Sequence, residues 1–440
     1  MPIVSAQQMQ RIEETLFASG MPVPALMEKV GGLLAQRVQA LYPLARYAQV
    51  GILVGPGHNG GDALVVAREL WLRGYRVSIY MPFARAKELT QAHAQFARSL
   101  SIPFVDTVDQ LRTSDLLIDG LFGFGLEREL SGDIAAVVTE VNQWGLPVVS
   151  IDLPSGIHTD TGAVLGSAIR ATHTLCLGLW KLGIVQEQAL EWVGQAALID
   201  FDIPATAIAL QLGQSFPIQR LMASEMVGLL PLVRPRSTHK YRQGHLLLVG
   251  GSQRYAGGII LSALGARAAG VGMLSIVVPA SLKALMVARL PDAIVYECSE
   301  TSQGAIASLP DSLALDRFDV VAYGPGVTTE SSTVLEPLLG SNRPLVLDAD
   351  GLTLLAQLGV EQLSQRSATT VLTPHAGEFQ RLFPELGDLL PYAAAQQAAQ
   401  AYNSIVVYKG ACTAIAAPNG QVWLNTESTP ALARGGSGDV

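Results

Sequence analysis

Short apolar runs alternate with longer amphipathic runs along this chain, and this rhythm limits its fold more than any other feature. Short apolar runs that end in glycine, proline or polar residues are typical of buried strands, whereas the longer runs are typical of helices. Strands that alternate with helices form parallel sheets with helices on both faces. The sequence therefore predicts an α/β protein whose first half is a doubly wound, Rossmann-like sheet.

The expected elements follow this rhythm in both halves of the chain. In the first half, strands are expected at residues 50–54, 76–81, 116–119, 148–152 and 174–177. Helices are expected between them, for example over residues 62–73 and 133–144. A capping box of Ser5 and Gln8 predicts an earlier helix with an apolar face of Met9, Ile12 and Leu16. In the second half, strands are expected at residues 245–249, 274–278, 320–323, 345–348, 370–373 and 405–408.

Length and composition predict two domains. A chain of 440 residues exceeds what one core usually holds, and 49% hydrophobic with 15% charged residues suits buried sheets rather than disorder. Strict alternation is lost between residues 203 and 236, where the prolines are Pro204, Pro217, Pro231 and Pro235. We therefore expect one domain over residues 1–215, a connection in this interval, and a second α/β domain over residues 222–440.

Charge and cysteine content exclude several classes of protein. A net charge of −8 without clusters of lysine and arginine argues against nucleic-acid binding. The three cysteines lie far apart without zinc spacing, which predicts a reduced, cytoplasmic setting. The longest apolar stretch, over residues 257–279, is interrupted by Arg267, so no membrane span is expected.

A glycine-rich loop, GPGHNGGD at residues 55–62, follows the first expected strand of the sheet. Its glycines satisfy G-x-G-x-x-G, but residues 80–83 contain no acid to bind a ribose, and no Lys-Ser or Lys-Thr pair follows the glycines. The dinucleotide fingerprint and the P-loop are both unsupported. What remains is an anion cradle over residues 59–62 at the start of a helix.

Two more polar clusters, DGLFGFG at residues 119–125 and DLPSG at residues 152–156, follow expected strands. Ligands of open α/β sheets bind beyond the carboxyl ends of strands, so the three clusters are expected to converge on one crevice. The alternative is that Asp62, Asp119 and Asp152 only cap helices or turns.

The sequence ends in a second loop, RGGSGD at residues 434–439, which is expected to open a helix. Stacked N–H groups at a helix start stabilise a transferring phosphoryl group, and Asp439 is placed to accept the proton of an attacking hydroxyl. The alternative is a simple turn with Asp439 as a helix cap. Further clusters in this half lie at residues 239–244, 250–252, 323–326, 348–350, 373–379 and 409–413.

These motifs together resemble one family. GPGHNGGD, DGLFGFG and SIDLPSG, with Lys181 in GLWKLG, are similar to the N-terminal epimerase domain of the bifunctional NAD(P)H-hydrate repair enzymes. The clusters of the second half resemble the ribokinase-like dehydratase domain of the same enzymes. The resemblance implies an isomerase that interconverts the R and S forms of hydrated NADH and NADPH, and a lyase that dehydrates the S form at the expense of ADP.

The resemblance implies three potassium ligands, Asn59, Asp119 and Ser155, in the first domain. Asp152 is the expected proton-transfer residue, and Lys181 would supply a complementary charge; its alternative is a solvated or salt-bridged lysine. The family usually has Asn at position 58 and Gly at position 63, where this chain has His and Ala. The implied substrate-binding residues are His58, Asn59, Gly60, Gly61, Asp62, Gly123, Phe124, Gly125, Leu126, Glu127, Arg128, Glu129 and Asp152.

In the second domain the resemblance implies that Asp439 deprotonates the substrate hydroxyl, which is phosphorylated and then leaves as phosphate. The implied cofactors are ADP and magnesium, with ATP left open, and a homo-oligomer is expected. The implied nucleotide-binding residues are Lys409, Gly410, Ala411, Cys412, Thr413 and Gly438. The implied contacts to the hydrated cofactor are Gly258, Gly326, His375 and Asp439.

The family continues beyond Gly-Ser-Gly-Asp-Val with further helices, so we expect a chain ending at Val440 to be truncated and its dehydratase activity to be less secure. Two other functions remain open from the sequence. One is a ribokinase-type kinase of a vitamin precursor or a sugar. The other is a nucleotide-binding module with impaired catalysis.

Overall fold

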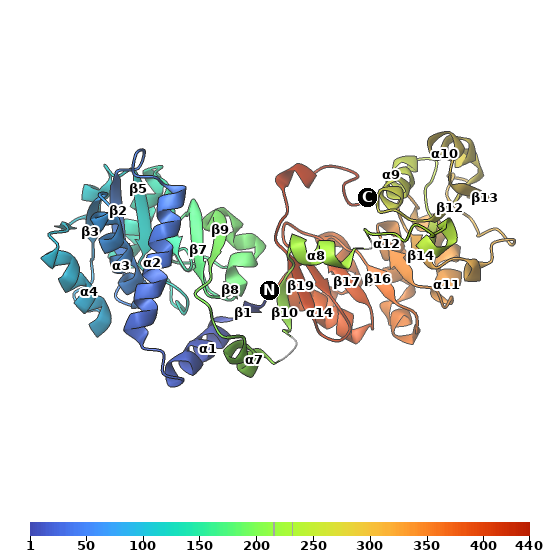
Figure 1. Ribbon diagram of the computed structural model, residues 1–440. Coiled ribbons are helices and arrows are strands. Elements are labelled where there is room, and N and C mark those ends of the chain that lie inside the picture. The colour runs from blue at the N-terminus through green and yellow to red at the C-terminus, as the bar shows by residue number, and fades with distance from the viewer. Residues whose placement is uncertain (214–215, 231) are drawn as a thin grey trace. The chain divides into compact units, whose positions relative to one another are not determined.

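The computed structural model describes residues 1–213, 216–230 and 232–440 (Figure 1). The chain divides into two compact units, Pro2–Phe216 and Pro217–Val440, with Met1 grouped with the second. Ser215, the last residue of the predicted first domain, and Pro231 lie outside the described residues. Within the described part of the chain, no helix combines the length and the apolar character that crossing a membrane requires.

The first unit contains a parallel sheet of seven strands in the order β4-β3-β2-β5-β6-β7-β9. If β2 is numbered as strand 1 and the others follow along the chain, the first four positions of the sheet read 3-2-1-4. This is the order of a doubly wound Rossmann-like sheet. The predicted strands are confirmed to within one residue at each end, while β4 and β9 were not predicted. The bounds are β2 Gln49–Val54, β3 Arg76–Tyr80, β4 Phe104–Val105, β5 Leu116–Gly120, β6 Val148–Ile151, β7 His173–Leu177 and β9 Gln195–Ile199.

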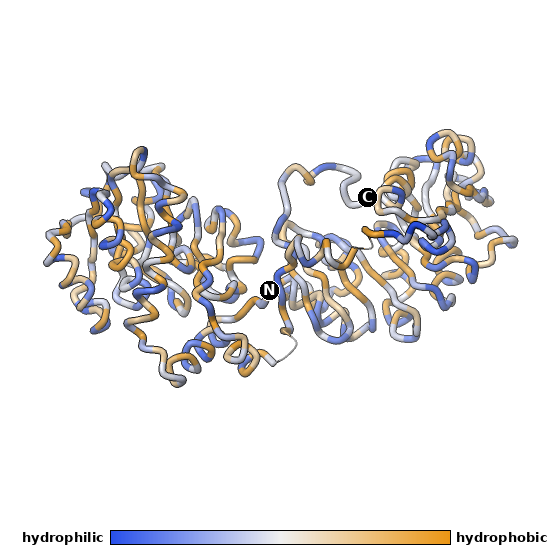
Figure 2. Tube along the Cα trace, in the orientation of Figure 1, coloured by the Kyte–Doolittle hydropathy of each residue, from blue (hydrophilic) through white to orange (hydrophobic). Residues whose placement is uncertain are grey.

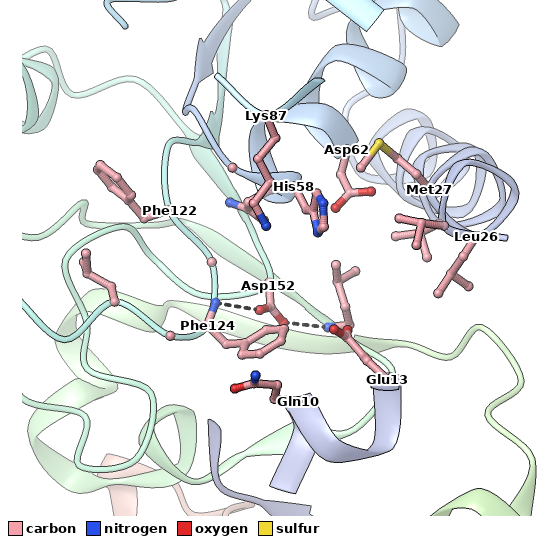
Figure 3. A pocket seen from close by; sticks show the side chains of 18 of the residues that line it. Gln10, Glu13, Leu26, Met27, His58, Asp62, Lys87, Phe122, Phe124 and Asp152 are labelled. Atoms are coloured by element: carbon pink, nitrogen blue, oxygen red, sulfur yellow. Dashed lines mark hydrogen bonds between the residues drawn. The ribbon is translucent and has the colours of Figure 1, made fainter. Parts of the chain in front are cut away.

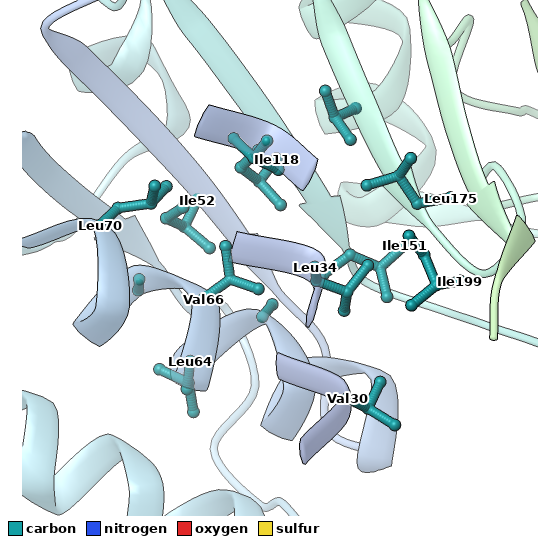
Figure 4. Packing of buried hydrophobic residues seen from close by; sticks show 14 of the residues in the cluster. Val30, Leu34, Ile52, Leu64, Val66, Leu70, Ile118, Ile151, Leu175 and Ile199 are labelled. Carbon is teal, nitrogen blue, oxygen red and sulfur yellow. The ribbon is translucent and has the colours of Figure 1, made fainter. Parts of the chain in front are cut away.

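Helices cover both faces of this sheet, and the side chains of each strand alternate between two cores. Leu116 and Ile118 of β5 pack into the larger cluster with α2 and α3, whereas Leu117 packs into the other cluster with α5. Figure 4 shows part of the larger cluster, where Leu34 of α2 lies close to Ile151. The helices are α1 Ala6–Ala18, α2 Val23–Leu41, α3 His58–Leu72, α4 Glu88–Ser99, α5 Gly132–Gln143, α6 Leu190–Val193 and α7 Ala205–Leu212.

Helix α3 begins at His58, four residues before the predicted start at residue 62. The glycines that predicted a loop belong to the first turns of this helix. Other parts of the chain pass very close to two of them. A Cβ atom on Gly60 would lie 2.0 Å from the carbonyl oxygen of Gly55, and one on Gly61 would lie 2.7 Å from Met27. Gly60 and Gly61 therefore permit close packing of α3.

A two-stranded parallel sheet fixes the start of α1. Strand β1 (Ile3–Val4) pairs with β8 (Trp180–Lys181), with Val4 opposite Lys181. The predicted capping box is confirmed, because Ser5 Oγ accepts from Gln8 N at 3.2 Å and Gln8 Oε1 accepts from Ser5 N at 2.9 Å. The buried face of α1 is also as predicted, and α1 is held beside the strand that carries Lys181.

The second unit contains a sheet of ten strands in the order β10-β19-β18-β17-β16-β15-β14-β11-β12-β13. The pairs β17–β18 and β18–β19 are antiparallel, and the other pairs are parallel. All six predicted strands are confirmed, and β10, β13, β18 and β19 were not predicted. The bounds are β10 Ile218–Arg220, β11 His245–Val249, β12 Met273–Pro279, β13 Ile294–Cys298, β14 Val320–Tyr323, β15 Leu345–Leu347, β16 Thr370–Leu372, β17 Ile405–Tyr408, β18 Thr413–Ala416 and β19 Val422–Asn425.

The interval predicted as a connection, residues 203–236, holds regular structure: α7, β10 and a further helix, α8. Strand β10 pairs with β19 and so belongs to the second sheet. Hydrophobic and hydrophilic stretches alternate along the trace of both units (Figure 2), as the rhythm of the sequence predicts. The helices of the second unit are α8 Ala223–Leu229, α9 Ala256–Ala268, α10 Lys283–Arg289, α11 Ser332–Leu339, α12 Asp350–Leu358, α13 Ala376–Leu382 and α14 Pro391–Ala401.

Candidate active sites

The three polar clusters of the first half meet at one cavity of about 760 Å³. They follow β2, β5 and β6, which are neighbours in the sheet, so their carboxyl ends share one edge. Gly60, Gly61 and Glu129 are not among the described residues that line the cavity. The predicted residues that do line it are His58, Asn59, Asp62, Gly123, Phe124, Gly125, Leu126, Glu127, Arg128 and Asp152.

Asp152 follows β6 in a left-handed backbone conformation, with φ of 67°, which costs a non-glycine residue about 1 kcal/mol or more. Its carboxylate accepts three hydrogen bonds, two of which are drawn in Figure 3. Oδ2 accepts from the backbone N–H of Phe124 at 3.0 Å, and Oδ1 accepts from that of Leu177 at 3.2 Å. Oδ1 also accepts from Lys181 Nζ at 2.5 Å. Asp152 is therefore fixed in one orientation at the cavity.

Lys181 forms a buried ion pair with Asp152, which is the salt-bridged alternative stated for this lysine. Lys181 is 0% exposed and Asp152 2%. Lys181 also donates to the carbonyl oxygen of Leu177. Burial alone would lower the pKa of Lys181, but the Asp152 carboxylate and the Cys176 thiol raise it above its usual value. The lysine is thus an ammonium group at neutral pH, and its charge is directed at Asp152.

The predicted potassium ligands Asp119 and Ser155 are in direct contact. The buried Asp119 carboxylate accepts from Ser155 Oγ at 2.6 Å, Ser155 N at 2.9 Å, Ser150 Oγ at 2.7 Å and Leu121 N at 3.2 Å. All of these donors are neutral. Burial raises the pKa of Asp119, and the hydrogen bonds from Ser155 and its neighbours oppose that rise. The site therefore holds a buried carboxylate together with hydroxyl oxygens, which are hard ligands that suit an alkali cation.

Asn59, the third predicted ligand, has a buried Nδ2 atom without a hydrogen-bond partner among the described residues. Its Oδ1 atom borders Gly123, where an added Cβ atom would lie 3.0 Å from Asn59 Oδ1 and 3.3 Å from Asp152 Oδ2. A side chain at Gly123 would thus enter the space between these two polar groups. The unpaired amide and the open space beside it are typical of a site that a ligand completes.

The structure adds cavity residues that the sequence analysis missed. Glu13 of α1 faces the cavity. Burial raises the pKa of Glu13 to about 7, a rise that the charge of Lys181 opposes and the charge of Asp152 reinforces. Burial also raises the pKa of Asp62 well above its usual value, with contributions from Asp152 and Glu13. Helix α2 and neighbouring segments add an apolar wall and one lysine: Val23, Leu26, Met27, Val30, Phe201 and Lys87.

The second unit brings Asp348, Lys409 and Asp439 together. Lys409 Nζ lies 2.9 Å from Asp348 Oδ1, at the ends of β17 and β15. Burial and the Asp348 carboxylate raise the pKa of Asp439, while Lys409 opposes that rise. Asp439 therefore has the raised proton affinity that suits a general base.

Two predicted glycines, Gly258 and Gly438, lie against these charged groups, and a third, Gly326, lies against Gly258. A Cβ atom on Gly258 would lie 3.6 Å from Asp439 Oδ1 and 3.3 Å from the backbone N of Gly326. One on Gly438 would lie 3.4 Å from Lys409 Nζ. The glycines leave room for a ligand to approach backbone N–H groups beside Asp439.

His375 acts as the N-cap of α13, where its Nδ1 accepts from the backbone N–H of Gly377 at 3.0 Å. A backbone bridge places His375 next to Lys409. In the turn between β17 and β18, Gly410 N donates to Thr413 Oγ1 at 3.4 Å. Ala411 and Cys412 lie in the same turn.

Within the loop over residues 435–438, residues 435 and 436 form a turn and residues 437 and 438 form bends. The helix expected to open after this loop stays a prediction. Among the described residues, no group of three or more His, Cys, Asp or Glu side chains is arranged to hold a metal ion.

Two family models match parts of this chain. Residues 246–440 match the family described as NAD(P)H-hydrate dehydratase, and residues 23–183 match the YjeF-related protein N-terminus. The bifunctional NAD(P)H-hydrate repair enzyme of Thermosynechococcus vestitus is 54% identical, over 100% of this chain and 86% of that protein. This chain belongs to the bifunctional NAD(P)H-hydrate repair enzymes.

Another repair enzyme, from Synechocystis, is 53% identical over 100% of this chain and 84% of its own length. Among solved structures, the ADP/ATP-dependent NAD(P)H-hydrate dehydratase from Bacillus subtilis, co-crystallized with ATP and Mg²⁺, is 29% identical. It has a TM-score of 0.42 and covers 50% of this chain and 77% of that chain. The two repair enzymes match over both halves of this chain.

Proposed function

We propose that this chain repairs hydrated NADH and NADPH in two steps. The domain of residues 1–215 interconverts the R and S forms, and the domain of residues 222–440 dehydrates the S form with ADP. The observation that carries this proposal is the presence of two separate acid sites, Asp152 paired with Lys181 and Asp439 beside the Lys409–Asp348 pair. A ribokinase-type kinase would need only the second.

The first cavity suits a hydrated nicotinamide nucleotide. About 760 Å³ lies within the range of small-molecule sites. Leu26 and Met27 offer an apolar surface to a ring, and the first turn of α3 and the loop over residues 123–128 offer polar groups to the rest of the nucleotide. Inversion at a carbon that bears a hydroxyl beside a ring nitrogen requires a fixed proton acceptor, which we assign to Asp152.

Asn59, Asp119 and Ser155 are proposed to hold a potassium ion. The buried Asp119 carboxylate receives only neutral donors, so a cation there would offset its charge. When bound, the ion would supply positive charge beside the substrate loop. We expect the epimerase rate to rise and saturate as potassium replaces tetramethylammonium at constant ionic strength, and Asp119→Asn to weaken this dependence. A rate that is independent of potassium would contradict the assignment.

In the second domain Asp439 is proposed to deprotonate the substrate hydroxyl, while the amides of residues 435–438 stabilise the transferring phosphoryl group. Phosphate is a better leaving group than water, and its expulsion by the ring nitrogen restores NADH or NADPH. Lys409–Thr413 and Gly438 would bind ADP with magnesium, and Gly258, Gly326 and His375 would contact the hydrated cofactor. We propose a cytoplasmic homo-oligomer.

A near-ultraviolet absorbance assay tests the dehydratase. The full chain with the S form of hydrated NADH, magnesium and ADP should regenerate the absorbance of reduced nicotinamide. Asp439→Asn should reduce this rate by about 10²-fold or more, because the hydroxyl loses its base, while ADP still binds. No absorbance gain with either ADP or ATP would refute the dehydratase function. Equal rates in the variant and the unchanged chain would remove Asp439 from its role.

A further inference from the structure

One wall of the first cavity belongs to α1, which carries none of the family motifs named above. The cavity-lining residues of this helix lie three or four positions apart and so share one face: Gln10, Glu13, Glu14 and Phe17. The adjacent face of the helix is buried in the core: Met9, Ile12 and Leu16. The capping box and the β1–β8 pairing fix the start of the helix. Glu13 is therefore held toward the same space as Asp152 (Figure 3).

Glu13 shares this space with two other carboxyl groups, Asp62 and Asp152, and lies within electrostatic reach of Lys181 and Lys87. The lysines cannot neutralise all three acids, because Lys181 already contacts Asp152 at 2.5 Å. Burial then leaves the pKa of Glu13 at about 7. Glu13 can thus carry a proton at neutral pH in a cavity where Asp152 is paired with the ammonium group of Lys181.

We propose that Glu13 is a second acid–base residue of the epimerase site, which protonates the departing hydroxyl of the hydrated nicotinamide ring. This inference rests on the proposed epimerase function. The Glu13 proton passes to the hydroxyl oxygen, and the carbon–oxygen bond breaks while the lone pair of the ring nitrogen forms a C=N⁺ bond. Water leaves from that face of the ring.

Water then adds to the other face of the same carbon, and the electrons of the C=N⁺ bond return to nitrogen. Asp152 takes the proton that the added water releases. In the reverse direction Asp152 and Glu13 exchange these roles, so the reaction consumes no other reagent. Glu13 on α1 and Asp152 at the end of β6 are two acid–base groups on different elements. Such a pair suits a reaction in which water leaves one face of a carbon and adds to the other face.

The proton-donor role fixes the sign of the pH dependence. Because Glu13 must be protonated to act on the hydroxyl, the rate falls as the pH rises through about 7. The charged groups that face Glu13 from other elements are Lys181 of β8, Asp152 after β6, Asp62 and His58 of α3, and Lys87 before α4. The variant Glu13→Gln separates its contribution to this profile from theirs.

The test measures interconversion of the R and S forms of hydrated NADH by the full chain across about pH 5.5 to 9. We expect Glu13→Gln to lower kcat by about 10²-fold or more and to remove the alkaline fall, with KM little changed. Glu13→Asp should recover part of the rate with an alkaline fall. Glu187→Gln is the matched control, because Glu187 is exposed on the short helix Glu187–Ala189 and does not line the cavity.

Two results would overturn the proposal: a Glu13→Gln rate within about threefold of the unchanged chain, or a lower rate that keeps the alkaline fall. If Glu13→Gln does not fold, Glu13→Asp is measured in its place. An unchanged interconversion rate in Glu13→Asp, with the fall in rate at the same alkaline pH as in the unchanged chain, would overturn the proposal. A chain that dehydrates the S form but never interconverts the two forms would refute the epimerase function itself.

Discussion

At the scale of single residues, the Lys181–Asp152 pair contributes to stability as well as to chemistry. Removal of one partner leaves a buried, unpaired charge, which costs roughly 3–5 kcal/mol. We expect Lys181→Met to lower the free energy of unfolding by about that amount, and Lys181→Met with Asp152→Asn to recover part of it. Urea unfolding followed by tryptophan fluorescence measures this, because four of the five tryptophans lie in the first unit: Trp71, Trp144, Trp180 and Trp192.

The pKa of Lys181 is raised in the folded state, so its contribution is complete below the unfolded pKa and is lost only as the pH rises through the higher folded value. The loss in Lys181→Met should therefore be the same across about pH 6 to 9. Lys29→Met is the control, because its ion pair with Asp202 is exposed and should contribute less than about 1 kcal/mol. If Lys181→Met and Lys29→Met had equal free energies of unfolding, the buried pair would contribute no more to stability than the exposed one.

The sequence could predict some residues of the first site and not others, for physical reasons. Asn59, Asp119 and Asp152 stand out because polar residues directly after apolar strands have few structural uses at a sheet edge. Glu13 does not stand out, because a single acid in an amphipathic helix looks like part of a solvated face. Its signal was the row of polar residues beside the buried face of α1, which gains meaning only when the cavity next to it is known.

At the scale of elements, contiguous apolar runs predicted the central parallel strands closely, because strands buried on both faces contain few polar residues. The missed strands are of other kinds. β4 has only two residues, β18 and β19 are half-buried and antiparallel, and β10 lies in an interval rich in proline. Pairings such as β1 with β8 join distant segments too short for a periodic pattern, yet this one places α1 and Glu13 beside Lys181.

At the scale of the whole molecule, both units build their sites by the same rule. Parallel strands bring their carboxyl ends to one edge, so polar residues far apart in sequence meet there: Asp119 and Asp152 in the first unit, Asp348 and Lys409 in the second. In the first unit, the position of the motifs after expected strands was enough to predict this convergence. Side-chain pairing, such as the contact of Lys181 with Asp152, depends on loop geometry that a strand pattern does not fix.

Because each unit builds its site from its own residues, the two steps should separate by mutation and recombine by mixing. With an equal mixture of R and S forms and excess ADP, the unchanged chain should regenerate all of the NADH. Asp152→Asn should promptly regenerate only the NADH that comes from the S form. The NADH that comes from the R form should appear about 10²-fold or more slowly. Asp439→Asn should regenerate almost none.

An equimolar mixture of these two variants should restore the full yield, because the S form released by one chain is a free substrate for the other. Pure S form is the control, on which Asp152→Asn and the unchanged chain should have equal rates. Full prompt yield from Asp152→Asn alone would mean that epimerisation does not need Asp152. Failure of the mixture, with each variant active in its own remaining step, would mean that the S form reaches the second site only within one chain.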